Sequence, residues 1–254
     1  MYEHHRQTIE NLRDYLQPDE KNIALIVNGS VARDEAMDVS DVDFYVVVED
    51  RLFDERSAQN ATGVEASQCC VAPCPECNGG LTTKTVLKNW RDRGSELQRW
   101  AFTKALVVFS RDPEIEGLVQ EIPTYPEAER IRRMESYHSQ IYFHFSFFEF
   151  AYLSQTKFLI YQTVAQMLLA AGRLILADNR KLYPGRKWFY RELERTPDKP
   201  NGFCEAVIHF LDTPTIEAGQ RILDMIENHK SYPVPAEGMS TRFFKESTLN
   251  LEEW

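Results

Sequence analysis

Two aspartates and a Gly-Ser pair are the residues whose types and spacing could support chemistry. Gly29 and Ser30 follow an apolar run closely, and Asp41 and Asp43 come after ten further residues. Mg²⁺ prefers oxygen ligands, and two such ions about 3.5–4 Å apart can hold the attacking and leaving oxygens of a phosphoryl transfer. A glycine lets backbone N–H groups approach phosphate oxygens, to which a serine hydroxyl can also donate. The pattern therefore predicts a metal-bound phosphate site.

Two strands and the turn between them must position these residues. The run Ile23–Val27 is apolar and rich in β-branched residues, which predicts a buried strand, and Val42–Val48 is predicted as a second one. Side chains of a strand alternate between its two faces. Asp41 and Asp43 should therefore lie side by side on one face, while Val42 turns into the core.

The same residues resemble the signature of the polymerase-beta-like nucleotidyltransferase superfamily. The resemblance is carried by Gly29, Ser30, Ala32, Arg33, Glu35, Ser40, Asp41 and Asp43. The residues between the two motifs are similar to those of the small bacterial branch, which includes aminoglycoside nucleotidyltransferases and minimal nucleotidyltransferases. Weaker similarity extends further along the chain, through Arg93–Glu96, Phe109–Pro113, Tyr183–Pro184 and Lys187–Trp188.

The resemblance implies a Mg²⁺-dependent enzyme that transfers a nucleoside monophosphate from a nucleoside triphosphate to an acceptor hydroxyl. The acceptor would be an aminoglycoside-like small molecule or a protein side chain, held in a groove between two domains. Asp41 and Asp43 would be catalytic and bind Mg²⁺. The residues expected to bind the nucleotide are Gly29, Ser30, Arg33, Ser40 and Lys187. Two alternatives remain open, a catalytically impaired nucleotide-binding protein and an interaction protein of the toxin–antitoxin type.

The predicted third strand departs from the family's pattern. Members usually supply a third carboxylate from the strand beside Asp43, which the sequence predicts at Leu81–Leu87, where Thr82 or Thr83 stands in its place. A hydroxyl is a weak, neutral ligand for Mg²⁺. Another carboxylate could substitute, one metal ion could suffice, or turnover could be lost while nucleotide binding survives. The nearest acidic residues in the sequence are Glu76, Asp92 and Glu96.

Four of the five cysteines gather in the short segment 69–77. Cys74 and Cys77 have the spacing of a zinc knuckle, and Cys69 or Cys70 could complete a four-thiolate site. The alternative is a loop whose thiols have no common role, because a compact cluster without a distant second pair would strain the chelate. A structural Zn²⁺ beside the predicted third strand is therefore one of two open interpretations.

The predicted fold is α+β, with a small mixed-sheet domain over residues 1–122 and an all-α helical-bundle domain over residues 123–254. No Gly or Pro occurs over residues 127–171, which is too long for one ordinary helix and predicts two helices meeting near Ser154. In aminoglycoside nucleotidyltransferases a Glu of the helical domain acts as general base, and Glu149 is the similar candidate. An ion pair with Lys157, or exposure at a helix end, is the alternative.

Composition narrows the class of protein. The chain of 254 residues carries a formal net charge of −10, which argues against general nucleic-acid binding because phosphate contacts need Lys and Arg. No run of 18 apolar residues suggests a membrane span, and the odd number of cysteines fits a cytoplasmic protein with reduced thiols. A homodimer formed through the helical domain is a further expectation.

Overall fold

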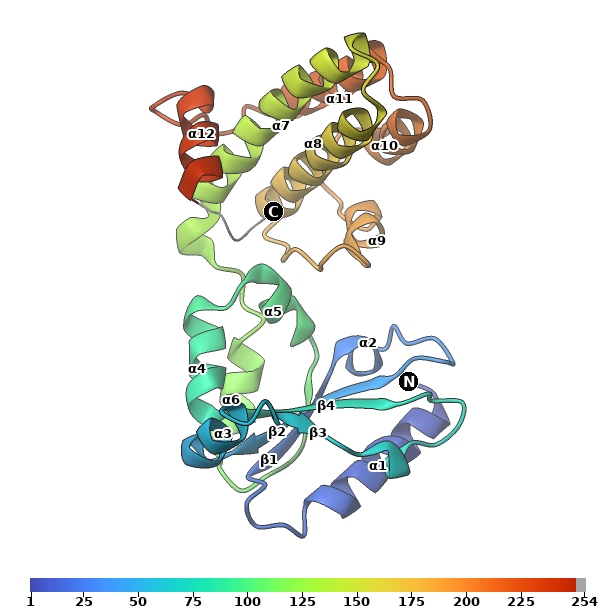
Figure 1. Cartoon of the computed structure of the whole chain (residues 1–254), viewed down its shortest axis with the longest axis vertical. Helices are drawn as coiled ribbons and strands as arrows, with labels where there is room; N and C mark the ends of the chain where they lie inside the picture. Colours follow the sequence, from blue (N-terminus) through green and yellow to red (C-terminus); the bar gives the residue numbers. More distant parts are fainter. Residues whose placement is uncertain (250–254) are drawn as a thin grey trace. The chain divides into compact units, whose positions relative to one another are not determined.

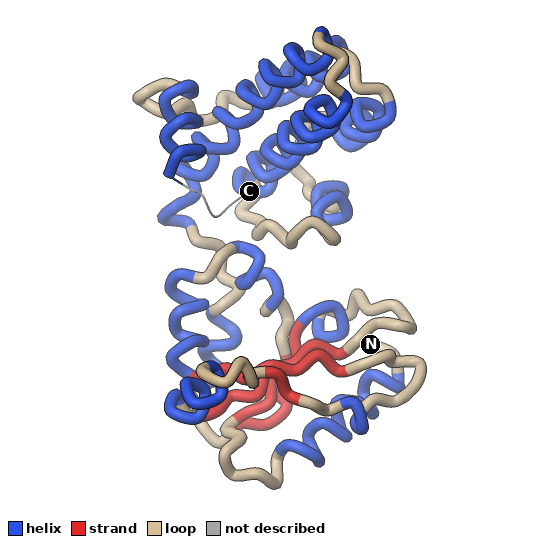
Figure 2. The backbone as a smooth tube through the Cα atoms, viewed as in Figure 1, coloured by secondary structure: helices blue, strands red, loops and turns tan. Residues whose placement is uncertain are grey.

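The chain folds as two compact units, the first spanning Met1–Tyr125 and the second beginning at Pro126. The structure is a computed structural model that describes residues 1–249. Within these residues all strands belong to the first unit, while helices and loops make up the second (Figures 1 and 2). The predicted α+β class, a mixed-sheet domain followed by helices, is confirmed.

A five-stranded mixed sheet forms the centre of the first unit, in the order β3-β4-β2-β1-β5. The strands are β1 (Ala24–Asn28), β2 (Val42–Val48), β3 (Gly63–Val64), β4 (Cys77–Thr83) and β5 (Leu106–Ser110). β2 pairs antiparallel with β1 and parallel with β4. The outer pairs, β1 with β5 and β3 with β4, are antiparallel. The two strands predicted around the Gly-Ser and Asp motifs are therefore neighbours at the middle of the sheet.

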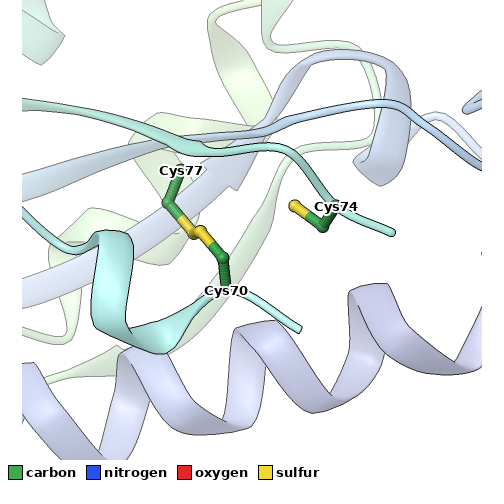
Figure 3. A group of neighbouring side chains, drawn as sticks. All are labelled: Cys70, Cys74 and Cys77. Atoms are coloured by element: carbon green, nitrogen blue, oxygen red, sulfur yellow. A yellow bond between two sulfur atoms is a disulfide. The ribbon is translucent and has the colours of Figure 1, made fainter. Parts of the chain in front are cut away.

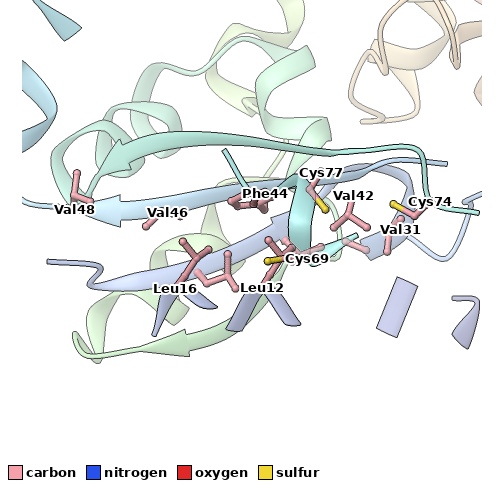
Figure 4. Close-up of a cluster of buried hydrophobic side chains, with 14 residues drawn as sticks. Leu12, Leu16, Val31, Val42, Phe44, Val46, Val48, Cys69, Cys74 and Cys77 are labelled. Carbon is pink, nitrogen blue, oxygen red and sulfur yellow. The ribbon is translucent and has the colours of Figure 1, made fainter. Parts of the chain in front are cut away.

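Helices cover both faces of this sheet. On one face, α1 (Glu3–Leu16) contributes Leu12 to a core cluster with Leu25 of β1 and Phe44 of β2 (Figure 4). On the other face, α4 (Lys84–Arg93) and α6 (Glu114–Glu121) contribute to a second cluster, which includes Leu87 and Ile26. Successive residues of β1 thus enter opposite clusters, as expected for a strand buried on both faces.

The remaining helices of the first unit are short. They are α2 (Gly29–Ala32), α3 (Asp50–Ser57), the 3₁₀ turn η1 (Ser67–Cys69) and α5 (Glu96–Ala101). The predicted interruption of the helical stretch at Gly94 is confirmed, because Gly94 ends α4 and Ser95 caps α5 by accepting a hydrogen bond from the Gln98 N–H.

The prediction of a third strand at Leu81–Leu87 is wrong by four residues. The strand is Cys77–Thr83, and the Thr83 hydroxyl caps α4 by accepting a hydrogen bond from the Val86 N–H at 3.2 Å. Glycines usually indicate a loop, which hid the first half of this strand. Gly79 is there because the Phe44 ring fills the space of its side chain, with Cζ 2.1 Å from an ideal Cβ position.

Two long helices dominate the second unit and pack against each other along their length (Figure 1). These are α7 (Arg130–Leu153) and α8 (Lys157–Asp178), and the break around Ser154 falls where the absence of Gly and Pro predicted two helices to meet. The other elements are η2 (Glu127–Glu129), α9 (Phe189–Glu194), α10 (Phe203–Asp212), α11 (Ile216–His229) and α12 (Met239–Leu249).

Among the described residues, α8 is long and apolar enough to cross a membrane when judged by length and composition alone. Within its most apolar window, 56% is buried inside the structure. A core helix of a helical bundle has the same character, since burial against neighbouring helices selects apolar residues on most sides. The packing of α8 on α7 accounts for its composition.

Candidate metal and nucleotide site

Asp41 and Asp43 lie at the start of the central strand, as the sequence predicted. Asp41 immediately precedes β2 and Asp43 is its second residue; both are half-buried, whereas Val42 between them is fully buried. Because alternate residues of a strand share a face, the two carboxylates lie on one side of it. Asp43 is flanked on both sides, by Asn28 of β1 and by Asn78 of β4.

Gly29 brings the turn that follows β1 directly against the Asp43 carboxylate. Its φ is +74°, in the left-handed region that favours glycine, and an ideal Cβ on it would lie 2.3 Å from Oδ2 of Asp43. Two independent constraints therefore require a glycine here, one from the backbone and one from the Asp43 carboxylate. Ser30 follows, half-buried, in the first turn of α2.

Asn28 adds an oxygen to the site and was not predicted from the sequence. The residue is 6% exposed, ends β1 beside Gly29 and lies opposite Asp43. Its Oδ1 is buried and has no hydrogen-bond partner among the described residues. A buried polar atom without a partner is costly and calls for a ligand, a water molecule or an ion. Carboxylate and amide oxygens are the donors that Mg²⁺ prefers, so the residues present fit this ion.

The strand register corrects the predicted position of the third ligand. Thr82 and Thr83 pair with Val47 and Val48, at the far end of β2 from the aspartates. Asn78 is the residue beside Asp43 instead, and its Nδ2 donates to Oδ2 of Asp41 at 2.5 Å. The family's third carboxylate is thus replaced here by a neutral amide.

Of the three acidic residues named from the sequence as substitutes, Glu76 is the one that the structure places near the pair. Its Oε1 lies 3.5 Å from the Nδ2 of Asn78, which in turn contacts Asp41. Asp92 instead accepts hydrogen bonds from Arg91, and Glu96 is buried in α5. Glu76 is an exposed residue, so its side chain is accessible to a ligand.

Arg33 and Ser40 hold the loop between the two motifs. The Arg33 side chain is 6% exposed, pairs with Glu35 at 3.2 Å, and lies 3.7 Å over the centre of the Trp100 ring. Its guanidinium thus packs inside the unit, and the role of Arg33 as a nucleotide ligand stays a prediction. The Ser40 hydroxyl accepts a hydrogen bond from the Met37 N–H at 2.9 Å, which closes the turn before Asp41.

Glu149 and Lys187 belong to the second unit. Glu149 is half-buried near the C-terminal end of α7, about 28 Å along the helix axis from Arg130 at its start. Lys187 is exposed ahead of α9, with its Nζ 5.5 Å from the centre of the Trp188 ring. The roles of Glu149 as a base and of Lys187 as a phosphate ligand both stay predictions.

The cysteine segment lies directly beside the carboxylate pair. Cys77 begins β4 and pairs with Val42, one residue before the Asn78–Asp43 pair. The sulfurs of Cys70, Cys74 and Cys77 lie together, and Cys70 and Cys77 form a disulfide (Figure 3). Cys69 is separate from this group and buried in the core cluster beneath α1. Burial raises the pKa of the Cys74 thiol above its ordinary value.

Comparisons with known proteins find one family match and similar solved structures. Residues 2–104 match the family described as "Putative nucleotidyltransferase DUF294". A solved structure of a nucleotidyltransferase-like protein from Exiguobacterium sibiricum is similar at 14% identity and a TM-score of 0.47, over 95% of this chain and 74% of that one. No curated protein matches the chain. The aminoglycoside branch stays a prediction, but over residues 2–104 the chain carries a domain of the nucleotidyltransferase superfamily.

Proposed function

We propose that the first unit binds a nucleoside triphosphate with Mg²⁺ and transfers its nucleoside monophosphate to an acceptor hydroxyl. The observation that supports this most is that the Asp43 carboxylate occupies the space of a Cβ on Gly29, beside the unpartnered Oδ1 of Asn28. This arrangement concentrates oxygen donors at the entrance of a glycine turn. It suits a phosphate chain bound together with a hard cation.

The residues of the first unit have different roles in binding the triphosphate. Asp41 and Asp43 would hold Mg²⁺, which when bound supplies positive charge to the triphosphate oxygens. The backbone at Gly29 and the hydroxyl of Ser30 would contact those oxygens from the turn. Arg33 acts indirectly, because its packing on Trp100 fixes the far end of the same turn. Asn78 orients Asp41 through its hydrogen bond of 2.5 Å.

The transfer balances without a further reactant. The acceptor oxygen forms a bond to the α-phosphorus while the bond from that phosphorus to the α–β bridging oxygen breaks, and pyrophosphate leaves. The hydroxyl proton passes to a base, for which Glu149 is the proposed residue. We take the acceptor to be a small molecule or a protein side chain in the cytoplasm. The net charge of −10 favours a cationic acceptor over a polyanion such as nucleic acid.

Titration calorimetry with several triphosphates, with Mg²⁺ and with a chelator, tests the binding step. The substitutions Asp41→Asn and Asp43→Asn should each weaken Mg²⁺-dependent binding about tenfold or more, because each removes a charged oxygen ligand. Asp54→Asn on the exposed face of α3 is the matched control and should bind as the original protein does. Full affinity in either active-site variant would show that the metal lies elsewhere.

Asn78 favours a second candidate function, nucleotide binding without efficient transfer. An amide in place of a third carboxylate removes one negative charge from the ligand set beside Asp43. A nucleotide could then bind while the metal-bound transition state is poorly stabilised. Such a protein would act as a nucleotide sensor or would sequester the nucleotide.

Pyrophosphate release with the original chain and with Asn78→Asp separates the two candidates. If the amide limits catalysis, the aspartate variant should raise the rate by about tenfold or more. If Glu76 already supplies the third charge, Asn78→Asp should change the rate little and Glu76→Gln should lower it. Triphosphate binding without pyrophosphate release in either variant, across varied acceptors, favours the nucleotide-binding protein.

A further inference from the structure

Three sulfur atoms from one short segment meet beside the candidate site. The Sγ atoms of Cys70, Cys74 and Cys77 all lie within 4.8 Å of one another. Cys74 and Cys77 are buried, and Cys70 is half-buried. Figure 3 shows the three side chains converging from the loop and from the first residue of β4. The three sulfurs come from a segment of eight residues, and their spacing suits one shared ligand.

We propose that Cys70, Cys74 and Cys77 bind one Zn²⁺ through their thiolates, with solvent in the fourth position. Zinc–sulfur bonds are about 2.3 Å long, which in a tetrahedral site places the sulfurs about 3.8 Å apart. The three sulfurs lie within 4.8 Å of one another, so once the disulfide is reduced, side-chain rotations can bring them to this spacing. The Cys70–Cys77 disulfide must first take two electrons and two protons from a thiol reductant, which is itself oxidised to a disulfide. The three thiols then release three protons as three Zn–S bonds form.

Cys69 is excluded from this site although it neighbours Cys70 in sequence. Cys69 shares a core cluster with Cys74 and Cys77, but its sulfur is not among the three that lie within 4.8 Å of one another. Successive residues at this point therefore face in different directions, with Cys69 toward α1 and Cys70 toward Cys77. The four-thiolate site anticipated from the sequence is reduced to three thiolates.

The loop that carries the thiols is already held at both ends. The Asn11 amide donates to the Cys69 carbonyl at 3.1 Å, and the Val71 N–H donates to the Thr8 hydroxyl at 3.0 Å, which fixes the first end on α1. Pairing of Cys77 with Val42 fixes the other end on the sheet. Because the ligand-bearing segment is anchored before metal arrives, little ordering opposes binding.

A zinc ion here would also tie the loop to the carboxylate pair. Asn78 follows the ligand Cys77 directly and contacts Asp41. The Cys70–Cys77 disulfide joins two of the same three sulfurs, so the disulfide and the zinc site are mutually exclusive forms of the segment. The disulfide leaves Cys74 buried beside the pair as a third thiol, a position that metal binding uses. With thiols reduced, the zinc form is the one that engages all three.

Zinc content of the full chain, purified with a reductant and without a chelator, tests the proposal directly. Elemental analysis should find about one zinc per chain, and a chromophoric chelator in competition should measure its affinity. Cobalt replacing zinc should show thiolate-to-cobalt charge-transfer absorption. Neither readout involves a nucleotide, so the result is independent of the proposed transferase activity. Absence of stoichiometric metal after reduction and zinc addition would overturn the assignment.

Cysteine variants identify the ligands. Cys70→Ser, Cys74→Ser and Cys77→Ser should each lower zinc affinity at least tenfold and weaken the charge-transfer band. Cys69→Ser and Cys204→Ser replace buried cysteines outside the group and should keep both signals. Loss of zinc in the Cys69 variant equal to that in Cys74→Ser would contradict the three-thiolate set. Circular dichroism of each variant separates loss of ligand from loss of fold, and the metal titration of the unmodified chain needs no variant.

Discussion

Gly29 meets two requirements, a left-handed backbone and a close contact with a carboxylate, whose effects can be separated by comparison with a second glycine. Its left-handed φ of +74° penalises any side chain, and the Asp43 carboxylate occupies the space of its Cβ. Gly202 has the same φ of +74°, yet nothing lies within 4 Å of its Cβ position. The two glycines therefore share the backbone constraint and differ only in the contact with the carboxylate.

Gly29→Ala should lower both stability and Mg²⁺-triphosphate affinity. The left-handed backbone costs about 1–3 kcal/mol for a residue with a Cβ, and displacement of Asp43 should weaken binding about tenfold or more. Gly202→Ala should show the stability cost alone. Urea unfolding and calorimetry of both variants check this, and equal affinity of the two for triphosphate would mean that the Asp43 contact is unimportant.

At the scale of elements, His144 is a titratable side chain buried between helices of the second unit. It lies on α7, 7% exposed, with its ring 5.6 Å from that of Phe243 on α12. Its Nδ1 is buried without a hydrogen-bond partner in the described part of the chain. Burial lowers the pKa of His144 from 6.5 to about 4, so the folded state holds it neutral.

This burial predicts that α7–α12 packing weakens in mild acid. The pKa of His144 is lower in the folded chain than in the unfolded chain. As the pH falls, the unfolded chain therefore takes up the proton at a higher pH than the folded chain does. Stability is full above pH 6.5 and is lost as the pH falls from 6.5 toward 4. The loss attributable to His144 is about 2 kcal/mol between pH 7 and 5.

Urea unfolding at pH 7 and 5 should show a smaller acid loss in His144→Leu than in the original chain, since leucine removes the titration. His209→Gln, at an exposed position of α10, is the control and should leave the pH dependence unchanged. An identical acid loss in His144→Leu would assign the effect to other groups.

At the scale of elements, the sequence predicted periodicity well and register poorly. Apolar β-branched runs and the Gly94 interruption marked their strands and helices because local patterns suffice for them. β4 was misplaced because Gly79 and Gly80 look like loop residues, and the need for Gly79 depends on the Phe44 ring of the neighbouring strand. The neighbour of Asp43 depends on which residue of β4 pairs with it, which no local pattern contains.

The candidate site divides in the same way. Asp41, Asp43 and Gly29 could be named from spacing alone. Asn78 and Asn28 could not, because an asparagine is common in loops and at strand ends and becomes notable only beside the carboxylates. The packing of Arg33 on Trp100 could not be foreseen either, because it joins residues far apart in sequence.

The whole molecule joins a sheet unit and a helical unit, and the transfer reaction needs a test of whether both contribute. Glu149→Gln removes the proposed base on α7, which belongs to the second unit. Turnover should fall about a hundredfold, the lower range for a general base, while triphosphate affinity stays unchanged. Steady-state pyrophosphate release and calorimetry together check this split.

Glu217→Gln on the exposed side of α11 is the matched control for that experiment and should retain full turnover. Unchanged turnover in Glu149→Gln would remove Glu149 from the mechanism and leave the acceptor proton to solvent or to another base. A joint loss of turnover and of triphosphate affinity would instead indicate a structural role for the residue.

The position of β2, paired on both sides, affects which parts of the protein can vary during evolution. Amide protons of a central strand exchange with solvent only through the largest openings of a domain, whereas edge strands and turns exchange through small ones. Asp43 is thus carried by backbone that opens last, while the borders of β2, the 33–41 loop and helix α3, lie outside the sheet. Adaptation to a new acceptor can proceed in these borders without disturbing the carboxylates.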